Sequence, residues 1–351
     1  MALAIVAPDK FRGSLTAAEA ADAMAAGLEA AGLTARRIPL ADGGEGTLDA
    51  LLAARGGSTR STRVTGPLGV EVEAQWALLP DGTGVVEMAR ASGLSLVTGR
   101  SPSQAPGMRN DPLRASSRGT GELITAALRA GARRVIVGVG GSATTDGGLG
   151  AVDALGWSLA GHDVTVACDV ATPFLDAATV YGPQKGATSA QVSLLTRRLA
   201  RLGEVYRDRT GVDVTALEGA GAAGGLAGGL AAIGAQLEPG FEVVARAAGL
   251  DDALDGADVV VTGEGRLDAT SFEGKVVGGV VEWAAEAGVG KRVVIVGQAT
   301  PEGRDELSVL GDVELFTLTD RVWQAGDAFA RAALLVKEAA IEAGRHALAE
   351  G

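Results

Sequence analysis

Glycines, hydroxyl side chains and one acid follow each other at residues 140–148, which read GGSATTDGG. Glycines allow backbone N–H groups to approach an anion closely, and Ser142 and Thr144 add hydroxyl donors. Asp146 could bind a metal ion or accept a proton. The segment follows an apolar stretch, 133–139, that is typical of a buried strand. We therefore predict a phosphate-binding loop at the carboxyl end of a strand.

Acidic residues also stand at the ends of four other predicted strands. They are Asp9, Asp42 with Glu45, Asp169, and Glu264 with Asp268. Taken singly, an acid or a glycine at a strand end is usually a turn former. Five such ends together are harder to explain in that way, because the carboxyl ends of parallel strands share one edge of a sheet. Carboxylates gathered there repel each other unless a metal, a base or a proton offsets them, and Mg²⁺ with a nucleotide would do so.

Basic residues accompany these acids along the sequence. They are Lys10, Arg12, Arg118 and Lys185. Any one of them is most often a solvated surface charge. Lys185 lies between glycines and outside an obvious helix, so it is the better candidate for a positioned anion binder.

The elements that must hold these residues alternate at the start of the chain. Residues 3–7 and 35–40 read as strands, and Thr16 with Glu19 forms a capping box that predicts a helix to about Ala31. A strand, helix, strand, helix order is typical of a parallel sheet. Short, mostly antiparallel strands follow at 63–65, 70–79 and 83–88. A helix is predicted after Ser117.

The last third returns to the first pattern. Strands are predicted at 258–262, 292–296 and 314–318, the first of them ending in a loop at 263–268, and helices at 277–287 and 328–349. We expect an α/β fold of two domains. Residues 1–58 and 253–351 would form a parallel-sheet domain of Rossmann or flavodoxin-like type. Residues 59–252 would form an inserted mixed α/β domain, with the active site in the cleft between the two.

Composition narrows the class of protein. The chain has 351 residues, a net charge of −12, one cysteine and two histidines. The negative charge opposes nonspecific binding to nucleic acid or to an anionic membrane, and the Cys/His count opposes a zinc site. The N-terminal residues lack the basic start of a secretory signal, so we expect a cytoplasmic protein.

Known phosphate-binding signatures leave two other function classes open. The chain has no Gly-x-x-x-x-Gly-Lys-Ser/Thr motif, whereas 219–224 and 138–143 match Gly-x-Gly-x-x-Gly/Ala. A dinucleotide-dependent oxidoreductase acting on a small hydroxy acid is therefore one alternative. A nonenzymatic two-domain binder of small acids is another, although merely holding an anion would not require so many carboxylates.

Eight segments, taken in order, resemble the bacterial type I glycerate kinase family over nearly the whole chain. They are 7–14 (APDKFRGS), 41–47 (ADGGEGT), 117–122 (SRGTGE), 140–148, 167–170 (ACDV), 182–187 (GPQKGA), 219–225 (GAGAAGG) and 262–268 (TGEGRLD). The resemblance implies ATP-dependent phosphorylation of D-glycerate, commonly to 2-phosphoglycerate, with Mg²⁺. The chain departs from the family pattern in three places. Arg12 stands where lysine is more usual, Thr172 stands where asparagine is expected, and the segment 150–166 is shorter than is usual in the family.

Phosphoryl transfer requires positioning and charge neutralisation, and we assign residues to those tasks. Asp169 is the first choice to accept the proton of the attacking hydroxyl, followed by Asp146 and Asp9, and Lys185 would neutralise the transferred group. The predicted glycerate-binding residues are Lys10, Arg12, Ser14, Arg118 and Thr120. Those for the ATP phosphates are Gly140, Gly141, Ser142, Thr144, Gly221 and Gly224. Those for Mg²⁺ are Asp42, Glu45, Glu264 and Asp268. We expect small-molecule ligands only, and a monomer or homodimer.

Overall fold

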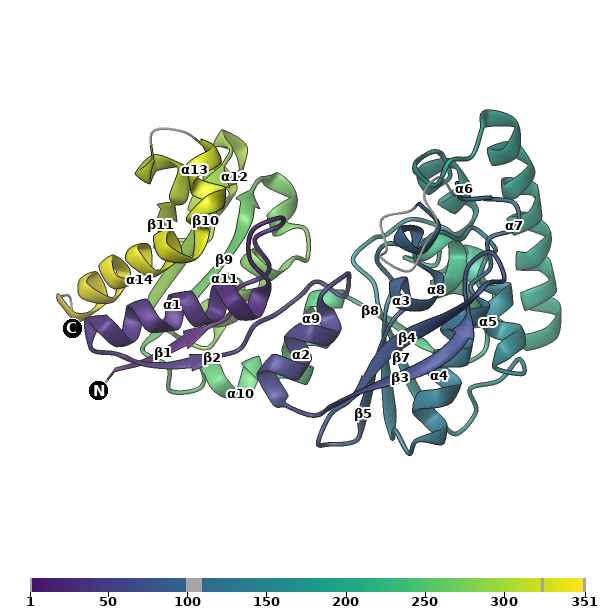
Figure 1. The fold of residues 1–351 in the computed structure, drawn as a ribbon, viewed down its shortest axis with the longest axis horizontal. Helices are drawn as coiled ribbons and strands as arrows, with labels where there is room; N and C mark the ends of the chain where they lie inside the picture. Colours follow the sequence, from purple (N-terminus) through teal and green to yellow (C-terminus); the bar gives the residue numbers. More distant parts are fainter. Residues whose placement is uncertain (1, 99–108, 323–324, 350–351) are drawn as a thin grey trace. The chain divides into compact units, whose positions relative to one another are not determined.

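The computed structural model describes residues 2–98, 109–322 and 325–349 (Figure 1). These residues divide into two compact units, each with its own sheet. The first unit comprises Met1–Asp42, Asp49–Arg55 and Phe241–Gly351, and the second comprises Gly43–Leu48 and Gly56–Gly240.

The first unit contains five parallel strands in the order β11-β10-β9-β1-β2. Their bounds are Leu3–Val6 for β1, Thr34–Arg37 for β2, Val259–Leu267 for β9, Lys291–Ala299 for β10 and Glu314–Thr317 for β11. Numbered within this sheet, the order is 5-4-3-1-2, which is the flavodoxin-like order. The order reverses between β1 and β9, and ligands of such sheets bind outside the carboxyl ends of the strands at that point.

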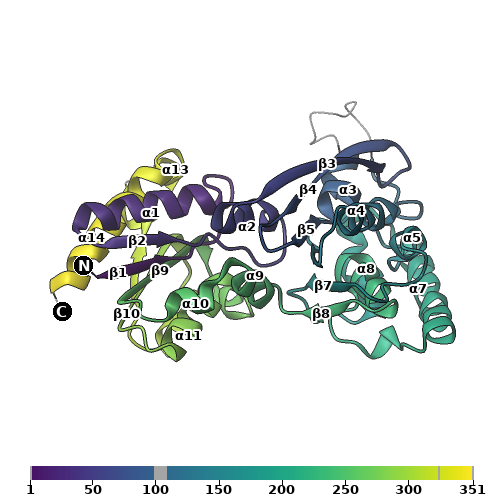
Figure 2. The same ribbon diagram turned by 90° about the horizontal axis from the view of Figure 1, so that it is seen from below.

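Helices cover both faces of this sheet (Figures 1 and 2). Their bounds are Ala17–Ala31 for α1, Thr47–Arg55 for α2, Gly240–Ala248 for α9, Leu250–Leu254 for α10, Val276–Glu286 for α11, Pro301–Val309 for α12, Ala325–Ala330 for α13 and Ala332–Ala349 for α14. Helices α1 and α14 bury Met24 and Leu335 against Val293. Helices α11 and α12 pack against Val294. Since neighbouring residues of a strand point to opposite faces, the two pairs lie on opposite sides.

Local sequence explains the ends of α1. Thr16 Oγ1 accepts a hydrogen bond from Glu19 N (3.2 Å), and Thr16 N donates to Glu19 Oε2 (2.8 Å). The helix stops at Gly32, whose φ of 104° belongs to the left-handed region that favours glycine. The predicted capping box and helix are confirmed.

The second unit contains six strands in the order β3-β4-β5-β6-β7-β8. Their bounds are Ser58–Thr65 for β3, Glu71–Leu78 for β4, Thr83–Glu87 for β5, Arg134–Gly138 for β6, Asp163–Ala167 for β7 and Gln236–Glu238 for β8. The pairs β3–β4 and β4–β5 are antiparallel, and the remaining pairs are parallel. The helices are Ala89–Ser92 (α3), Arg118–Arg129 (α4), Leu149–Ala154 (α5), Ala177–Tyr181 (α6), Ser189–Thr210 (α7) and Ala222–Ala232 (α8). The predicted α/β class with a second, mixed sheet is confirmed.

Two sequence predictions about elements are wrong. The predicted loop at 263–267 is the second half of β9, because it pairs with β10 from Gly263 to Leu267. The predicted helix at 328–349 is two helices, α13 and α14. The glycine-rich start of α8 is not regular helix, since Ala223, Gly224 and Gly225 all have positive φ.

Candidate active site

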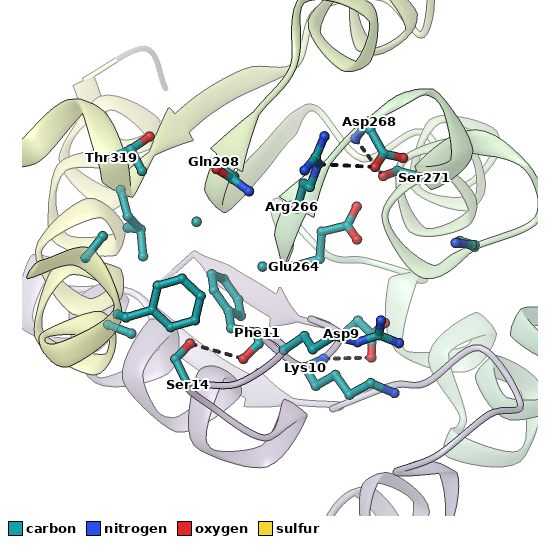
Figure 3. A pocket seen from close by; sticks show the side chains of 18 of the residues that line it. Asp9, Lys10, Phe11, Ser14, Glu264, Arg266, Asp268, Ser271, Gln298 and Thr319 are labelled. Carbon is teal, nitrogen blue, oxygen red and sulfur yellow. Dashed lines mark hydrogen bonds and ion pairs between the residues drawn. The ribbon is translucent and has the colours of Figure 1, made fainter. Parts of the chain in front are cut away.

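A cavity of about 390 Å³ lies at the carboxyl ends of the strands of the first unit (Figure 3). Its lining comes from the segments after β1 and β2, the second half of β9 with the segment that follows it, the end of β10, and the segments after β11. Seven predicted site residues line it: Asp9, Lys10, Arg12, Ser14, Asp42, Glu264 and Asp268. The cavity sits at the point where the strand order reverses, so the topology places these residues together although they are far apart in the sequence.

Two acids in this cavity titrate unusually. Burial is the main reason that the pKa of Asp9 is raised to about 6; within that value, the nearby Lys10 lowers the pKa and the nearby Asp42 raises it. Burial also raises the pKa of Glu264 to about 7, against a hydrogen bond from Ser271. Figure 3 shows Glu264, from β9, and Asp9, from the segment after β1, at the same side of the cavity. A pair of acids with pKa values near neutrality is typical of proton-transfer sites.

Bases balance the acids of the cavity. Lys10, Arg12, Arg266 and Lys275 line it together with the four acids. Arg266 Nε lies 3.4 Å from Asp268 Oδ2, and Lys275 Nζ donates to Thr270 Oγ1 (3.3 Å). Hydrogen bonds from Thr270 keep the pKa of Asp268 below its ordinary value. The cavity therefore offers both anionic and cationic groups to a charged ligand. The sequence analysis assigned no role to Arg266, Ser271 or Lys275. Arg266 lies within the quoted segment 262–268, and the other two residues follow that segment.

A cation would fit one position in this cavity. Oε1 of Glu264 is buried and has no hydrogen-bond partner among the described residues. A buried carboxylate oxygen without a donor is costly, and a bound cation would satisfy it. The described residues contain no group of three or more His, Cys, Asp or Glu side chains arranged for a metal. Mg²⁺ commonly uses one or two carboxylates and completes its coordination with water and substrate phosphates, so this acid suits a nucleotide-bound Mg²⁺.

The remaining predicted residues lie in the second unit, most of them around the loop 140–148. Lys185 Nζ donates to Thr144 O (2.6 Å) and to Ser142 Oγ (3.4 Å). Burial lowers the pKa of Lys185 to about 7. Asn110 Nδ2 donates to the carbonyls of Ala143 and Lys185 (both 2.9 Å). The sequence missed Asn110.

Several N–H groups of this loop donate within the protein. Ala143 N donates to Ser92 O (3.0 Å), Thr144 N to Ser142 Oγ (3.0 Å), and Gly147 N to Gly224 O (3.0 Å). A side chain at Gly224 would place its Cβ 1.9 Å from Thr144 O. Glycine there allows the loop and the start of α8 to pack backbone against backbone. Of the six residues predicted for ATP, the structure brings Ser142 and Thr144 next to Gly224, whereas Gly221 packs against Thr172 and Pro173 and Gly140 packs against Gly44.

Asp146 makes four hydrogen bonds. Its Oδ2 accepts from Ser117 N (2.8 Å), Ser117 Oγ (2.9 Å) and Gly150 N (3.2 Å), and its Oδ1 accepts from Gly148 N (3.2 Å). These donors lie at the starts of α4 and α5. The carboxylate therefore joins the first turns of two helices to the loop.

The other predicted acids of the second unit lie outside the first-unit cavity. Asp169 follows β7 and accepts a hydrogen bond from Gly240 N (2.9 Å), and Glu45 is exposed. Glu87, which the sequence missed, is buried at the end of β5 and accepts from Gly46 N and Leu48 N (both 2.9 Å). Its acidic type at the end of an otherwise apolar strand was the available signal.

The five predicted glycerate-binding residues fall in both units. Lys10, Arg12 and Ser14 line the cavity of the first unit. In the second unit, Arg118 Nε pairs with Glu122 Oε1 (2.9 Å), and buried Thr120 Oγ1 donates to Ser92 Oγ (2.9 Å).

Fold and cavity together define an α/β protein with a charged cavity at the switch point of a parallel sheet. Among the described residues, no helix combines the length and apolarity required to cross a membrane.

Comparisons with known proteins identify the family. A sequence model of the glycerate kinase family matches residues 4–163 and 157–347. Glycerate 2-kinase of Escherichia coli (strain K12) is 41% identical over 317 residues, covering 80% of this chain and 81% of the relative. Glycerate kinase of Bacillus subtilis (strain 168) is 39% identical over 368 residues, covering 94% and 93%. A crystal structure from Salmonella typhimurium LT2, named as a glycerate kinase 2, superposes with a TM-score of 0.84 at 36% identity over 99% of both chains. The chain therefore belongs to the glycerate kinase family.

Proposed function

We propose that this protein is a type I glycerate kinase that transfers the γ-phosphoryl group of ATP to D-glycerate and forms 2-phosphoglycerate. Family membership supports the reaction, and the relative from Escherichia coli supports the position because it is named glycerate 2-kinase. The observation that carries the proposal is the first-unit cavity, where acids with raised pKa values lie among lysines and arginines. Phosphoryl transfer to an alcohol needs both kinds of group.

In this proposal, Asp9 accepts the proton of the attacking hydroxyl. A pKa of about 6 leaves it ionised at neutral pH but more basic than an ordinary carboxylate, which suits a general base. Lys10 N donates to its Oδ1 (2.6 Å) and fixes its orientation. Asp169, the first choice from the sequence, remains the competing proposal for this role.

Glu264 would bind Mg²⁺ directly through its unpartnered carboxylate oxygen, and Asp42 and Asp268 would act on the ion through bound water. When bound, Mg²⁺ would neutralise charge on the phosphates. Glu45, the fourth acid predicted for Mg²⁺, lies in the second unit. The carboxylate of glycerate would bind Arg12 and Lys10, because a guanidinium presents two parallel donors to a carboxylate.

Residues of the second unit would support phosphoryl transfer in other ways. The loop at 140–144 with Gly221 and Gly224 remains our sequence-based proposal for contact with phosphate. Lys185 would bind the transferred phosphoryl group. The pKa of Lys185, about 7, favours this role. A lysine with this pKa is partly neutral at neutral pH, and the negative charge of an approaching phosphate would favour its protonated form.

We also propose a cytoplasmic location and a monomeric or homodimeric state. The single cysteine permits no intrachain disulfide, which suits a reducing compartment.

An assay of glycerate-dependent ATP consumption tests the proposed function. The enzyme is incubated with ATP, Mg²⁺ and one of D-glycerate, L-glycerate, glycolate or lactate, and phosphorus NMR identifies the product. We expect turnover with D-glycerate and a phosphomonoester at its secondary hydroxyl. Glu264→Gln provides the inactive control. Reduction of NAD(P)⁺ by D-glycerate without ATP consumption would instead support an oxidoreductase.

A further inference from the structure

The cavity of the first unit has an apolar end as well as a charged one. Leu318, Ala328, Phe329 and Ala332 line this end, together with the polar side chains of Gln298 and Thr319. They come from the end of β10, the segment after β11, and helices α13 and α14. Figure 3 shows Asp9, Glu264 and Asp268 on its right-hand side, and Thr319 on its left. The cavity therefore runs across the strand ends from a charged region to an apolar one.

Glycerate does not explain the apolar end. It has three carbons that carry a carboxylate and two hydroxyls, so an apolar surface would only desolvate it. Of the two substrates in the proposed reaction, the nucleotide alone has a large apolar part. We propose that the apolar end binds the purine base of the nucleotide, with its phosphates directed to the charged end. This inference rests on the proposed function and adds a site for the base to it.

Phe329 is the residue through which the base would be held. Its side chain is 62% exposed although it lines the cavity, so solvent covers most of an aromatic ring there. A built Cβ on Gly13 would lie 3.4 Å from Cε1 of Phe329, which places the ring beside the segment that carries Arg12 and Ser14. When a base stacks on an aromatic ring, one apolar face of the base and one apolar face of the ring are removed from water.

Two polar side chains supply hydrogen bonds at the same end. The amide of Gln298 offers both a donor and an acceptor, and the hydroxyl of Thr319 offers either. A purine presents donors and acceptors along its edge while its faces are apolar. Between the two ends, β9 and β10 present Gly265 and Gly297 to the cavity, so no side chain from these positions separates them.

Binding measurements on the full-length protein separate the base from the phosphates. Calorimetric titrations with ADP and with pyrophosphate are made without divalent cation for the wild type, Phe329→Ala and Phe329→Tyr. We expect Phe329→Ala to weaken ADP binding about tenfold, the scale of one lost base stack, and to leave pyrophosphate binding unchanged. Phe329→Tyr should retain ADP affinity. Leu334→Ala is the matched control, because Leu334 is a 47% exposed side chain of α14 that does not line the cavity.

Steady-state kinetics give a second readout. Phe329→Ala should raise the KM for ATP and leave the KM for glycerate unchanged. Equal weakening of ADP and pyrophosphate, unchanged ADP affinity, or a raised KM for glycerate alone would overturn the base site. A wild-type protein that binds ADP through Phe329 but does not phosphorylate glycerate would overturn the proposed function and retain the base site.

Discussion

Replacing Asp9 by asparagine should make the ligand-free protein more stable at pH 8 and much less active. The folded protein raises the pKa of this carboxyl from 3.8 to about 6. A group with such a shift binds its proton more tightly in the folded state than in the unfolded state. Its contribution to stability is complete below about pH 4 and is lost as the pH rises to about 6.

The magnitude follows from the size of the shift. A shift of about 2 pH units corresponds to about 3 kcal/mol, since each unit represents 1.36 kcal/mol. Asparagine keeps an oxygen that can accept the hydrogen bond from Lys10 N but carries no charge. Asp9→Asn should therefore raise the free energy of unfolding by about 3 kcal/mol at pH 8. For a unit of this size, that corresponds to a rise in Tm of roughly 6 to 12 °C.

Thermal melts at pH 4 and pH 8, in EDTA and without nucleotide, measure the difference. Asp305→Asn is the control, because Asp305 is exposed on α12 and lies outside the cavity. The stabilisation by Asp9→Asn should nearly vanish at pH 4, where the wild-type carboxyl is protonated. In the glycerate assay, kcat should fall at least a hundredfold if Asp9 is the base. An equal or lower Tm at pH 8, or the same gain at both pH values, would refute the reasoning.

Three further substitutions test other residues. Asp169→Asn preserves an acceptor for Gly240 N, so the Tm should change little. If Asp169 is the base, kcat should fall at least a hundredfold, and near wild-type turnover excludes that role. Arg12→Ala should raise the KM for glycerate roughly tenfold or more, the scale of a charged hydrogen bond, and an unchanged value moves the carboxylate site elsewhere. Thr16→Ala removes the cap of α1 and should lower the free energy of unfolding by about 1 kcal/mol, measured by denaturant unfolding. A decrease below a few tenths of a kcal/mol would exclude the cap as a stabilising contact.

Local patterns predicted the elements of the first unit well. The capping box at Thr16, the stop at Gly32 and the apolar strand at β1 each depend on interactions within a few residues. Strand ends in a parallel sheet share an edge, so the sequence also anticipated that Asp9, Asp42 and Glu264 would meet.

Features that depend on distant contacts could not be predicted. Residues 263–267 look like a loop because two glycines interrupt the apolar run, yet pairing with β10 keeps them extended. The positive φ of Ala223 depends on close packing against the loop 140–148, which no local pattern reports. Phe329 lines the cavity because α13 ends beside Gly13, more than three hundred positions away in the chain.

Asp146 illustrates why an acid in a glycine-rich loop is ambiguous. Its sequence position suggested contact with Mg²⁺ or a reacting hydroxyl, but its two oxygens accept four hydrogen bonds from the starts of α4 and α5. These bonds occupy both oxygens and hold the carboxylate in one orientation. A proton acceptor instead needs an oxygen that is open to substrate and a pKa near the working pH. Asp9 meets the second requirement and lines the cavity that also holds Lys10 and Arg12, so the arrangement favours Asp9 over Asp146 as the base and gives Asp146 the task of positioning the loop.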